Sequence, residues 1–187
     1  MLNEKDIVEE INDQYLFMRK MSKEDAEFLF DSLKQKSVNQ YLSLGPLSSL
    51  EHSKRLIDKY LRSWKKLRQF NYIIEIKEGN PRKKVGAISF WNLNWLHRRA
   101  EIGVWLTSSD YFNKGIGTRA VELIKNMGFI HLKLNRIEAH TAIENVNSIK
   151  LFKKCGFKEE GKLKEYIRLQ GKYHDAVVLA CFNNFLT

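Results

Sequence analysis

The sequence predicts an α+β fold, with a mixed, strongly twisted sheet of about seven strands and four helices in α/β/α-type layers. Three apolar strand patterns with short connections indicate an antiparallel meander, at residues 70–77, 85–91 and 100–106. The last of these strands leads through a helical pattern that starts at Gly115 into another strand at 136–141. This strand–helix–strand unit predicts one right-handed crossover between two parallel strands.

The elements before the meander follow from capping and periodicity. Residues 15–19 are predicted as a short strand, and residues 22–36 as a helix with Ser22 at its N-cap and Asp25 at N3, in a capping-box-like start. A second helix is predicted at 48–67. Its buried stripe lies at helical spacing and consists of Leu50, Ile57, Leu61 and Trp64.

The second half of the chain alternates in the same way. The helix after Gly115 places apolar residues at helical spacing, namely Ala120, Leu123, Ile124, Met127 and Ile130. A short helix at 148–155 ends at Gly156, which supplies the left-handed residue after the C-cap. Two final strands are predicted at 158–169 and 173–182.

Composition indicates one cytoplasmic enzyme domain over residues 1–187. A chain of this length with 43% hydrophobic residues can bury one sizeable core, and no linker or repeat interrupts it. We expect neither a signal peptide nor a membrane span, because no apolar run approaches about 20 residues. Cys155 and Cys181 lie in apolar patterns, so we expect reduced packing residues and no metal site.

The net charge of +10 is open to two interpretations. Lysine and arginine concentrate at 54–68, 82–84, 97–99 and 150–154, and solvated faces that keep the protein in solution account for most of them. A ribosome-associated or otherwise acidic partner is a second inference. Three of the cations are instead expected to bind an anionic ligand, namely Lys114, Arg119 and Lys153.

The most informative motif is the strand–loop–helix at 104–120, which holds Gly115 and Gly117. Backbone N–H groups of such a loop converge on one space, and the following helix adds its positive dipole end, so we expect a phosphate site. The glycines fit the dinucleotide fingerprint GxGxxA, but residues 107–114 separate them from the strand. A Walker A loop is excluded because Lys114 precedes the glycines, so the loop has another design.

A second motif lies at 144–157, where a strand end is followed by a polar cap, a short helix and a glycine stop. Asn145 or Asn147 can cap this helix. Together with Arg99-Ala100-Glu101-Ile102-Gly103, the KGIG loop and Gly171-Lys172-Tyr173-His174-Asp175, the motif resembles the GNAT superfamily of acetyl-CoA-dependent N-acetyltransferases. The resemblance covers roughly residues 13–183 and is nearer to the Rim-type branch, which acetylates N-terminal amines of ribosomal proteins.

The resemblance implies that acetyl-CoA is the cosubstrate and that strands 100–106 and 136–141 splay apart, with pantetheine filling the gap like a missing strand. The residues expected to bind it are Leu106, Thr107, Phe112, Asn113, Lys114, Gly115, Ile116, Gly117, Thr118, Asn145, Ser148, Phe152 and Lys153. The phosphate loop departs from the usual family pattern by carrying Phe112 and Asn113. Asn113 can still adopt the left-handed backbone that the loop needs.

Direct attack of an amine on a thioester requires a proton acceptor and an acid for the leaving thiolate. Glu101 and Glu138 lie on the strands that would flank the gap and are candidate acceptors; the alternative is that each forms an ion pair with a neighbouring arginine, Arg98, Arg99 or Arg136. Many relatives carry a tyrosine acid where this chain has Phe152. Ser148 is therefore the candidate acid, unless it only satisfies free N–H groups at the helix start.

The acceptor is expected to be a protein N-terminal α-amine. The alternative is a polyamine or aminoglycoside, which would need an acidic pocket, and the first helix offers Glu24, Asp25, Glu27 and Asp31 for one. A non-catalytic acyl-CoA or RNA-binding module is a further alternative, which the basic character of the chain would support. Homodimers are frequent in the resembling family, so a homodimer is also expected from the resemblance.

Overall fold

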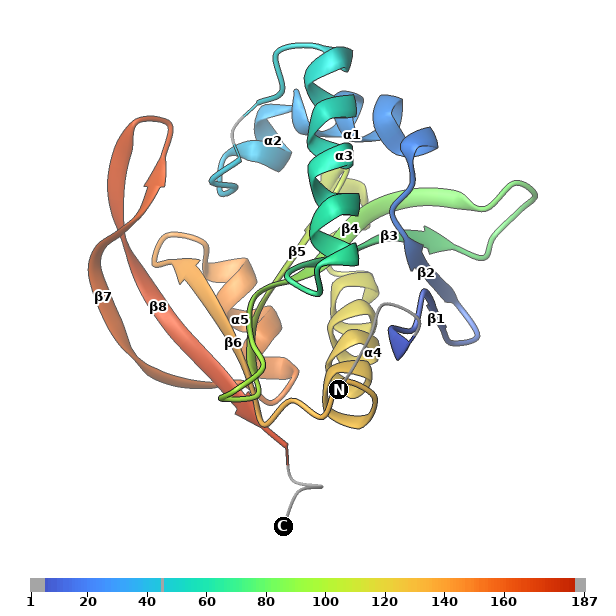
Figure 1. The fold of residues 1–187 in the computed structure, drawn as a ribbon. Helices are drawn as coiled ribbons and strands as arrows, with labels where there is room; N and C mark the ends of the chain where they lie inside the picture. Colours follow the sequence, from blue (N-terminus) through green and yellow to red (C-terminus); the bar gives the residue numbers. More distant parts are fainter. Residues whose placement is uncertain (1–5, 45, 184–187) are drawn as a thin grey trace.

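The structure is a computed structural model that describes residues 6–44 and 46–183. Its strands form one eight-stranded mixed sheet in the order β1-β2-β3-β4-β5-β6-β8-β7 (Figure 1). The strands are β1 (Glu10–Asn12), β2 (Leu16–Lys20), β3 (Phe70–Ile76), β4 (Lys83–Asn94), β5 (Arg99–Leu106), β6 (Arg136–Ala142), β7 (Lys158–Leu169) and β8 (Lys172–Phe182). The helices are α1 (Ala26–Leu33), α2 (Lys36–Asn39), α3 (Leu50–Lys65), α4 (Ile116–Ile130) and α5 (Val146–Lys154).

These elements confirm the predicted α+β class, the meander β3-β4-β5 and the parallel crossover from β5 through α4 to β6. The eighth strand, β1, was not predicted. It has three residues and pairs only with β2, so it is too short to show an alternating pattern in the sequence.

The predicted helix at 22–36 is wrong as a continuous element. The capping box is present, and the Ser22 N–H donates to Asp25 Oδ2 at 2.9 Å, but it opens only a 3₁₀ turn before α1 begins. Helix α1 then ends at Leu33 because the Asn39 side chain donates to the Leu33 carbonyl at 2.9 Å, while Gln35 is extended. A side-chain hydrogen bond to a carbonyl six residues earlier does not change the spacing of apolar residues, so the hydrophobic pattern of the sequence does not predict this helix end.

The sheet separates two hydrophobic clusters. Helices α1, α2 and α3 pack on one face, against Ile73, Ala87 and Trp105, while α4 and α5 cover the other face (Figure 1). Cys155 and Cys181 are buried thiols, and burial raises the pKa of each to about 12, so both are packing residues as predicted. No helix in the described part of the chain is long and apolar enough to cross a membrane.

The sheet opens between its two central parallel strands. β5 and β6 pair over only three positions, from Arg99 opposite Arg136 to Glu101 opposite Glu138. Beyond them β5 continues to Leu106 beside β4, and β6 continues to Ala142 beside β8. The predicted splay of the two strands is therefore present, and it begins immediately after the two glutamates.

Candidate active site

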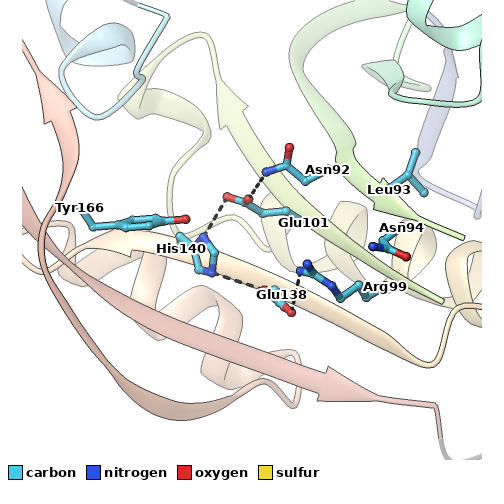
Figure 2. Close-up of a pocket in the computed structure, with 8 residues that line it drawn as sticks. All are labelled: Asn92, Leu93, Asn94, Arg99, Glu101, Glu138, His140 and Tyr166. Atoms are coloured by element: carbon cyan, nitrogen blue, oxygen red, sulfur yellow. Dashed lines mark hydrogen bonds and ion pairs between the residues drawn. The ribbon is translucent and has the colours of Figure 1, made fainter. Parts of the chain in front are cut away.

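A cavity of about 380 Å³ lies where the sheet opens. It collects side chains from the consecutive strands β4 and β5 and from β6 and β7, which come much later in the sequence (Figure 2). The lining residues are Asn92, Leu93, Asn94, Arg99, Glu101, Glu138, His140 and Tyr166. Both glutamates proposed from the sequence therefore face one cavity.

Glu101 occupies the wall that β5 contributes. Alternation along the strand puts it on the same face as Trp105, which is the face covered by α1–α3. Asn92 Nδ2 donates to Glu101 Oε2 at 2.9 Å, because an irregularity in β4 gives Asn92 a left-handed φ of 50° (Figure 2). Within the described residues no arginine pairs with Glu101, which argues against the ion-pair alternative for this side chain.

Glu138 has the opposite character. Its Oε1 accepts from Arg136 Nε at 2.6 Å and lies 3.5 Å from Arg99 Nη1, and Arg136 also binds Glu160. The ion-pair alternative thus describes Glu138, which pairs with Arg136 on its own strand and with Arg99 on β5. From the sequence, Glu101 and Glu138 are equally good candidates for the proton acceptor.

His140 lies between the two carboxylates. Its Nδ1 is 3.4 Å from Glu101 Oε1 and its Nε2 is 3.5 Å from Glu138 Oε2 (Figure 2). The Glu101 carboxylate raises the pKa of His140 by more than burial lowers it, and Glu138 adds to the increase. His140 is not among the residues predicted from the sequence, although it lies two residues after Glu138 on β6 and therefore shares its face.

Tyr166 covers the cavity from the long β7–β8 hairpin. Its ring meets the His140 ring edge-on at 5.1 Å and 88°. The β7 register shifts between Leu163 and Ile167, and within this bulge the Glu165 N–H donates to Asp175 Oδ1 at 2.9 Å. Sequence reasoning missed Tyr166 because a bulge is visible only from the partner strand.

The predicted phosphate loop has the expected backbone. Asn113 and Gly115 both adopt left-handed conformations, with φ of 59° and 78°, and Gly115 is the N-cap of α4. The Arg119 N–H donates to the Gly115 carbonyl, so the helical amides before it, at residues 116–118, point out of the helix end. These amides and the exposed side chain of Lys114 can together meet an anion.

Two residues of the loop and helix, Gly117 and Arg119, have other contacts as well. Gly117 lies in the first turn of α4, where a Cβ would approach Leu151 to 3.3 Å, so it also allows α4 and α5 to pack closely. Phe112 is 41% exposed. Arg119 pairs with Asp13 at 3.1 Å.

On β5 the available backbone is that of Leu106. The Thr107 N–H donates to the Val85 carbonyl at 2.9 Å, so it cannot serve an incoming ligand as expected. Because successive residues of a strand direct their N–H groups to opposite edges, Leu106 directs its own toward the opening.

At the start of α5 the capping role belongs to Asn145. Its Oδ1 accepts from the Ser148 N–H at 3.2 Å, which leaves the Ser148 hydroxyl free of that role. Ser148 Oγ lies 3.5 Å from Thr141 Oγ1 on β6.

The remaining α5 candidates are less exposed to a ligand. Phe152 is buried edge-on against Phe157, which makes it a packing residue, and Lys153 pairs with Glu159 at 2.7 Å. Coenzyme contacts for these two stay predictions.

The two halves of the site lie on opposite faces of the sheet. Glu101, Glu138 and His140 face the α1–α3 side, whereas Thr141 and the Ser148 that it meets face the α4–α5 side. The opening between β5 and β6 joins them. A ligand held at the N-terminus of α4 can therefore meet, through the sheet, a second ligand that sits in the cavity.

Two of the four acidic residues considered for an acceptor pocket are already paired. Asp25 is fully buried between Arg19 and Lys84, at 2.7 and 2.6 Å, and Asp31 pairs with Lys34. Asp25 is therefore not available to an acceptor, because it caps the turn before α1 instead of facing solvent, while Glu24 and Glu27 are exposed. The described residues contain no group of three or more His, Cys, Asp and Glu side chains that could hold a metal ion.

Comparisons with known proteins agree with this geometry. The model of the acetyltransferase (GNAT) domain matches residues 15–158. Spermidine N(1)-acetyltransferase of Escherichia coli is 28% identical to this chain over 89% of this chain and 86% of that protein. The putative ribosomal N-acetyltransferase YdaF of Bacillus subtilis is 37% identical over 49% of this chain and 50% of that protein. The crystal structure of Vibrio cholerae spermidine N-acetyltransferase with CoA and spermine superimposes with a TM-score of 0.80, at 22% identity, over 91% of this chain and 97% of that one.

Proposed function

Because this chain belongs to the GNAT family of acetyl-CoA-dependent N-acetyltransferases, we propose that its acceptor is a protein N-terminal α-amine, as in the Rim-type branch that acts on ribosomal proteins. The observation that carries the proposal is the position of Glu101, at the edge of the cavity and at the last paired position of β5 and β6. An amine in the cavity meets there a thioester that approaches through the opening of the sheet.

The residues present fit acetyl-CoA. The amides at 116–118 and the exposed Lys114 would hold the diphosphate, and the Leu106 N–H would face the pantetheine arm from the strand edge. We propose Asn145 as a contact for the pantetheine arm. The other candidates from the phosphate loop keep their predicted roles.

The proposed reaction is a direct transfer. As the neutral amine nitrogen bonds to the acyl carbon and the carbon–sulfur bond breaks, Glu101 accepts the proton that the nitrogen loses, directly or through one water. Ser148 donates its hydroxyl proton to the departing thiolate and recovers a proton from solvent. The products are the N-acetylated acceptor and coenzyme A with a free thiol.

Charge balance supports an α-amine acceptor. The two carboxylates that line the cavity, Glu101 and Glu138, share it with the guanidinium of Arg99 and with His140, whose pKa is raised by Glu101. Such a cavity offers little attraction to a polycation. A peptide α-amine, with a pKa of about 8, is roughly one-tenth neutral at pH 7, whereas an alkyl amine with a pKa near 10.4 is less than one-thousandth neutral.

Polyamine acetylation is the second candidate, because the E. coli spermidine acetyltransferase aligns with 89% of this chain. An acceptor series decides between the two. Release of free thiol from acetyl-CoA is measured with a lysine-containing peptide, the same peptide with its N-terminus blocked, and spermidine. We expect turnover only on the peptide with the free N-terminus. Turnover on spermidine and on neither peptide would overturn the α-amine proposal while leaving the family chemistry intact.

Domain organisation and cellular location are part of the proposed function. We propose that residues 1–187 act as one domain, since the described strands form a single sheet. We further propose a cytoplasmic location, in keeping with two unpaired thiols, and an association with the ribosome.

A further inference from the structure

Helix α3 and the turn after it hold a dense set of cations. Residues 50–68 contain seven lysines and arginines against two acidic residues, a net charge of +5, which is half of the +10 carried by all 187 residues. All seven side chains are exposed, and they are Lys54, Arg55, Lys59, Arg62, Lys65, Lys66 and Arg68.

Four of the seven lie along one line on the helix surface. At 3.6 residues per turn they fall within an arc of about 60°, and the helix rises about 16 Å from the first to the last. Ile57 and Trp64 occupy the opposite side of the helix and are buried in the core. We call these four residues the basic stripe: Arg55, Lys59, Arg62 and Lys66.

The basic stripe carries no carboxylate partners. Among the described residues no acidic group lies within 4.0 Å of its four side chains, and the two acids of α3 are used elsewhere, Glu51 by Lys54 and Asp58 by Lys23. Cations in other parts of the molecule, such as Arg19 and Arg136, form short ion pairs. Unpaired cations in a row raise the local potential, which draws a polyanion.

We infer that the basic stripe binds RNA through its phosphate backbone. A row of about 16 Å is long enough to contact several successive phosphates of one strand, because the charges of a nucleic-acid backbone repeat every few ångströms. A membrane surface fits less well, because a membrane-bound helix also inserts apolar side chains. None of the exposed large hydrophobic residues in the described part of the chain lies on α3.

The stripe lies on the side of the molecule that would receive the acceptor. Helix α3 packs on the same face of the sheet as Trp105, which shares its side of β5 with Glu101 (Figure 1). RNA bound to α3 would bring proteins attached to that RNA to the cavity side of the enzyme. The inference goes beyond the proposed function and does not depend on it, because RNA binding is measured without acetyl transfer.

The test compares two variants that lose the same charge. The first changes the stripe, R55Q/K59Q/R62Q/K66Q, and the control changes four exposed cations of β7, K158Q/K162Q/K164Q/R168Q. Binding of a labelled 20-base-pair RNA duplex is followed by fluorescence anisotropy between 50 and 200 mM salt. Urea unfolding confirms that both variants remain folded.

We expect the stripe variant to lose at least tenfold in affinity and the slope of log K against log salt to fall by about 3, since each phosphate contact contributes about 0.7 to 0.9. The control variant should bind within threefold of wild type. Equal losses in both variants would overturn the inference in favour of diffuse net charge. Loss of binding to anionic lipid vesicles without loss of RNA affinity would overturn it in favour of a membrane surface.

Discussion

Two clusters of ionisable side chains in this molecule have similar composition and different geometry. Each contains two carboxylates and two basic groups. The cluster beside α1 consists of Arg19, Asp25, Glu75 and Lys84. The cluster at the opening of the sheet consists of Arg99, Glu101, Glu138 and His140.

The contacts in the first cluster are short, from 2.6 to 2.9 Å. Burial alone would raise the pKa of Asp25, but hydrogen bonds from Arg19 and Lys84 outweigh it and lower the pKa to about 2. In the second cluster Glu138 is also held at 2.6 Å, by Arg136, whereas the contacts of His140 with Glu101 and Glu138 are 3.4 and 3.5 Å and border a cavity. Short, closed pairing stabilises a fold, whereas loose pairing beside a cavity leaves a carboxylate able to accept a new partner.

The largest expected effect breaks the closed cluster. Asp25→Asn removes a fully buried charge, takes from Lys84 its ion pair and leaves Arg19 with Glu75 alone, so we expect the free energy of unfolding to fall by about 3 kcal/mol. Urea denaturation at pH 7 measures this loss, while turnover per folded molecule should stay within twofold of wild type. Because the pKa of Asp25 is lower in the folded state, its carboxylate stabilises the fold at pH values above the unfolded pKa. The difference in unfolding free energy between wild type and Asp25→Asn should therefore vanish as pH falls from about 4 toward 2.

The next effect separates the two glutamates of the open cluster. Glu101→Gln removes the proposed proton acceptor, and we expect kcat to fall about 100-fold in the thiol-release assay with little change in stability. The matched variant Glu138→Gln weakens the pairing with Arg136, so it should cost more stability and less turnover. The opposite order would assign the proton route to Glu138.

The third effect tests the far side of the opening. Ser148→Ala should lower kcat about tenfold, because water can replace part of an acid's contribution, while the Kd for acetyl-CoA measured by calorimetry stays unchanged. Thr141→Val, which removes only the neighbouring hydroxyl, is the control and should have a smaller effect. A large rise in the Kd for acetyl-CoA would instead make Ser148 a binding residue.

The smallest effect concerns pH. His140 has a pKa raised by Glu101 in the folded state, so the stability it contributes is complete below the unfolded value of about 6.5 and is lost as pH rises through the folded value. The unfolding free energy of wild type relative to His140→Gln, measured from pH 5.5 to 8.5, should decrease with pH. A difference that grows with pH would show that the imidazole is held neutral.

Much of the fold was predictable because strand alternation and glycine stops are local signals. The meander, the crossover and the left-handed conformations of Asn113 and Gly156 are present as predicted. The break at Gln35 was not predictable, because it depends on Asn39 reaching back to a distant carbonyl.

The candidate site was predictable only as far as it depends on the same local signals. Alternation and adjacency of strands place Glu101 and Glu138 side by side, as expected from the sequence. The difference between them was hidden, because it depends on Glu160 and Arg136 meeting across separate strands. Asn92 and Tyr166 were hidden for a related reason, since irregular strand pairing aims each of them.

The three-residue parallel ladder between β5 and β6 also has a mechanical consequence. Two antiparallel blocks, β1–β5 and β6–β8, are joined through the sheet by this ladder alone among the described strands. Native-state hydrogen exchange should therefore resolve them as separate opening units, with the weak seam between them. A pantetheine arm that hydrogen-bonds to the strand edges at this seam would couple the two units. The two blocks should therefore open as one cooperative unit when acetyl-CoA is bound and as two units when coenzyme A has left.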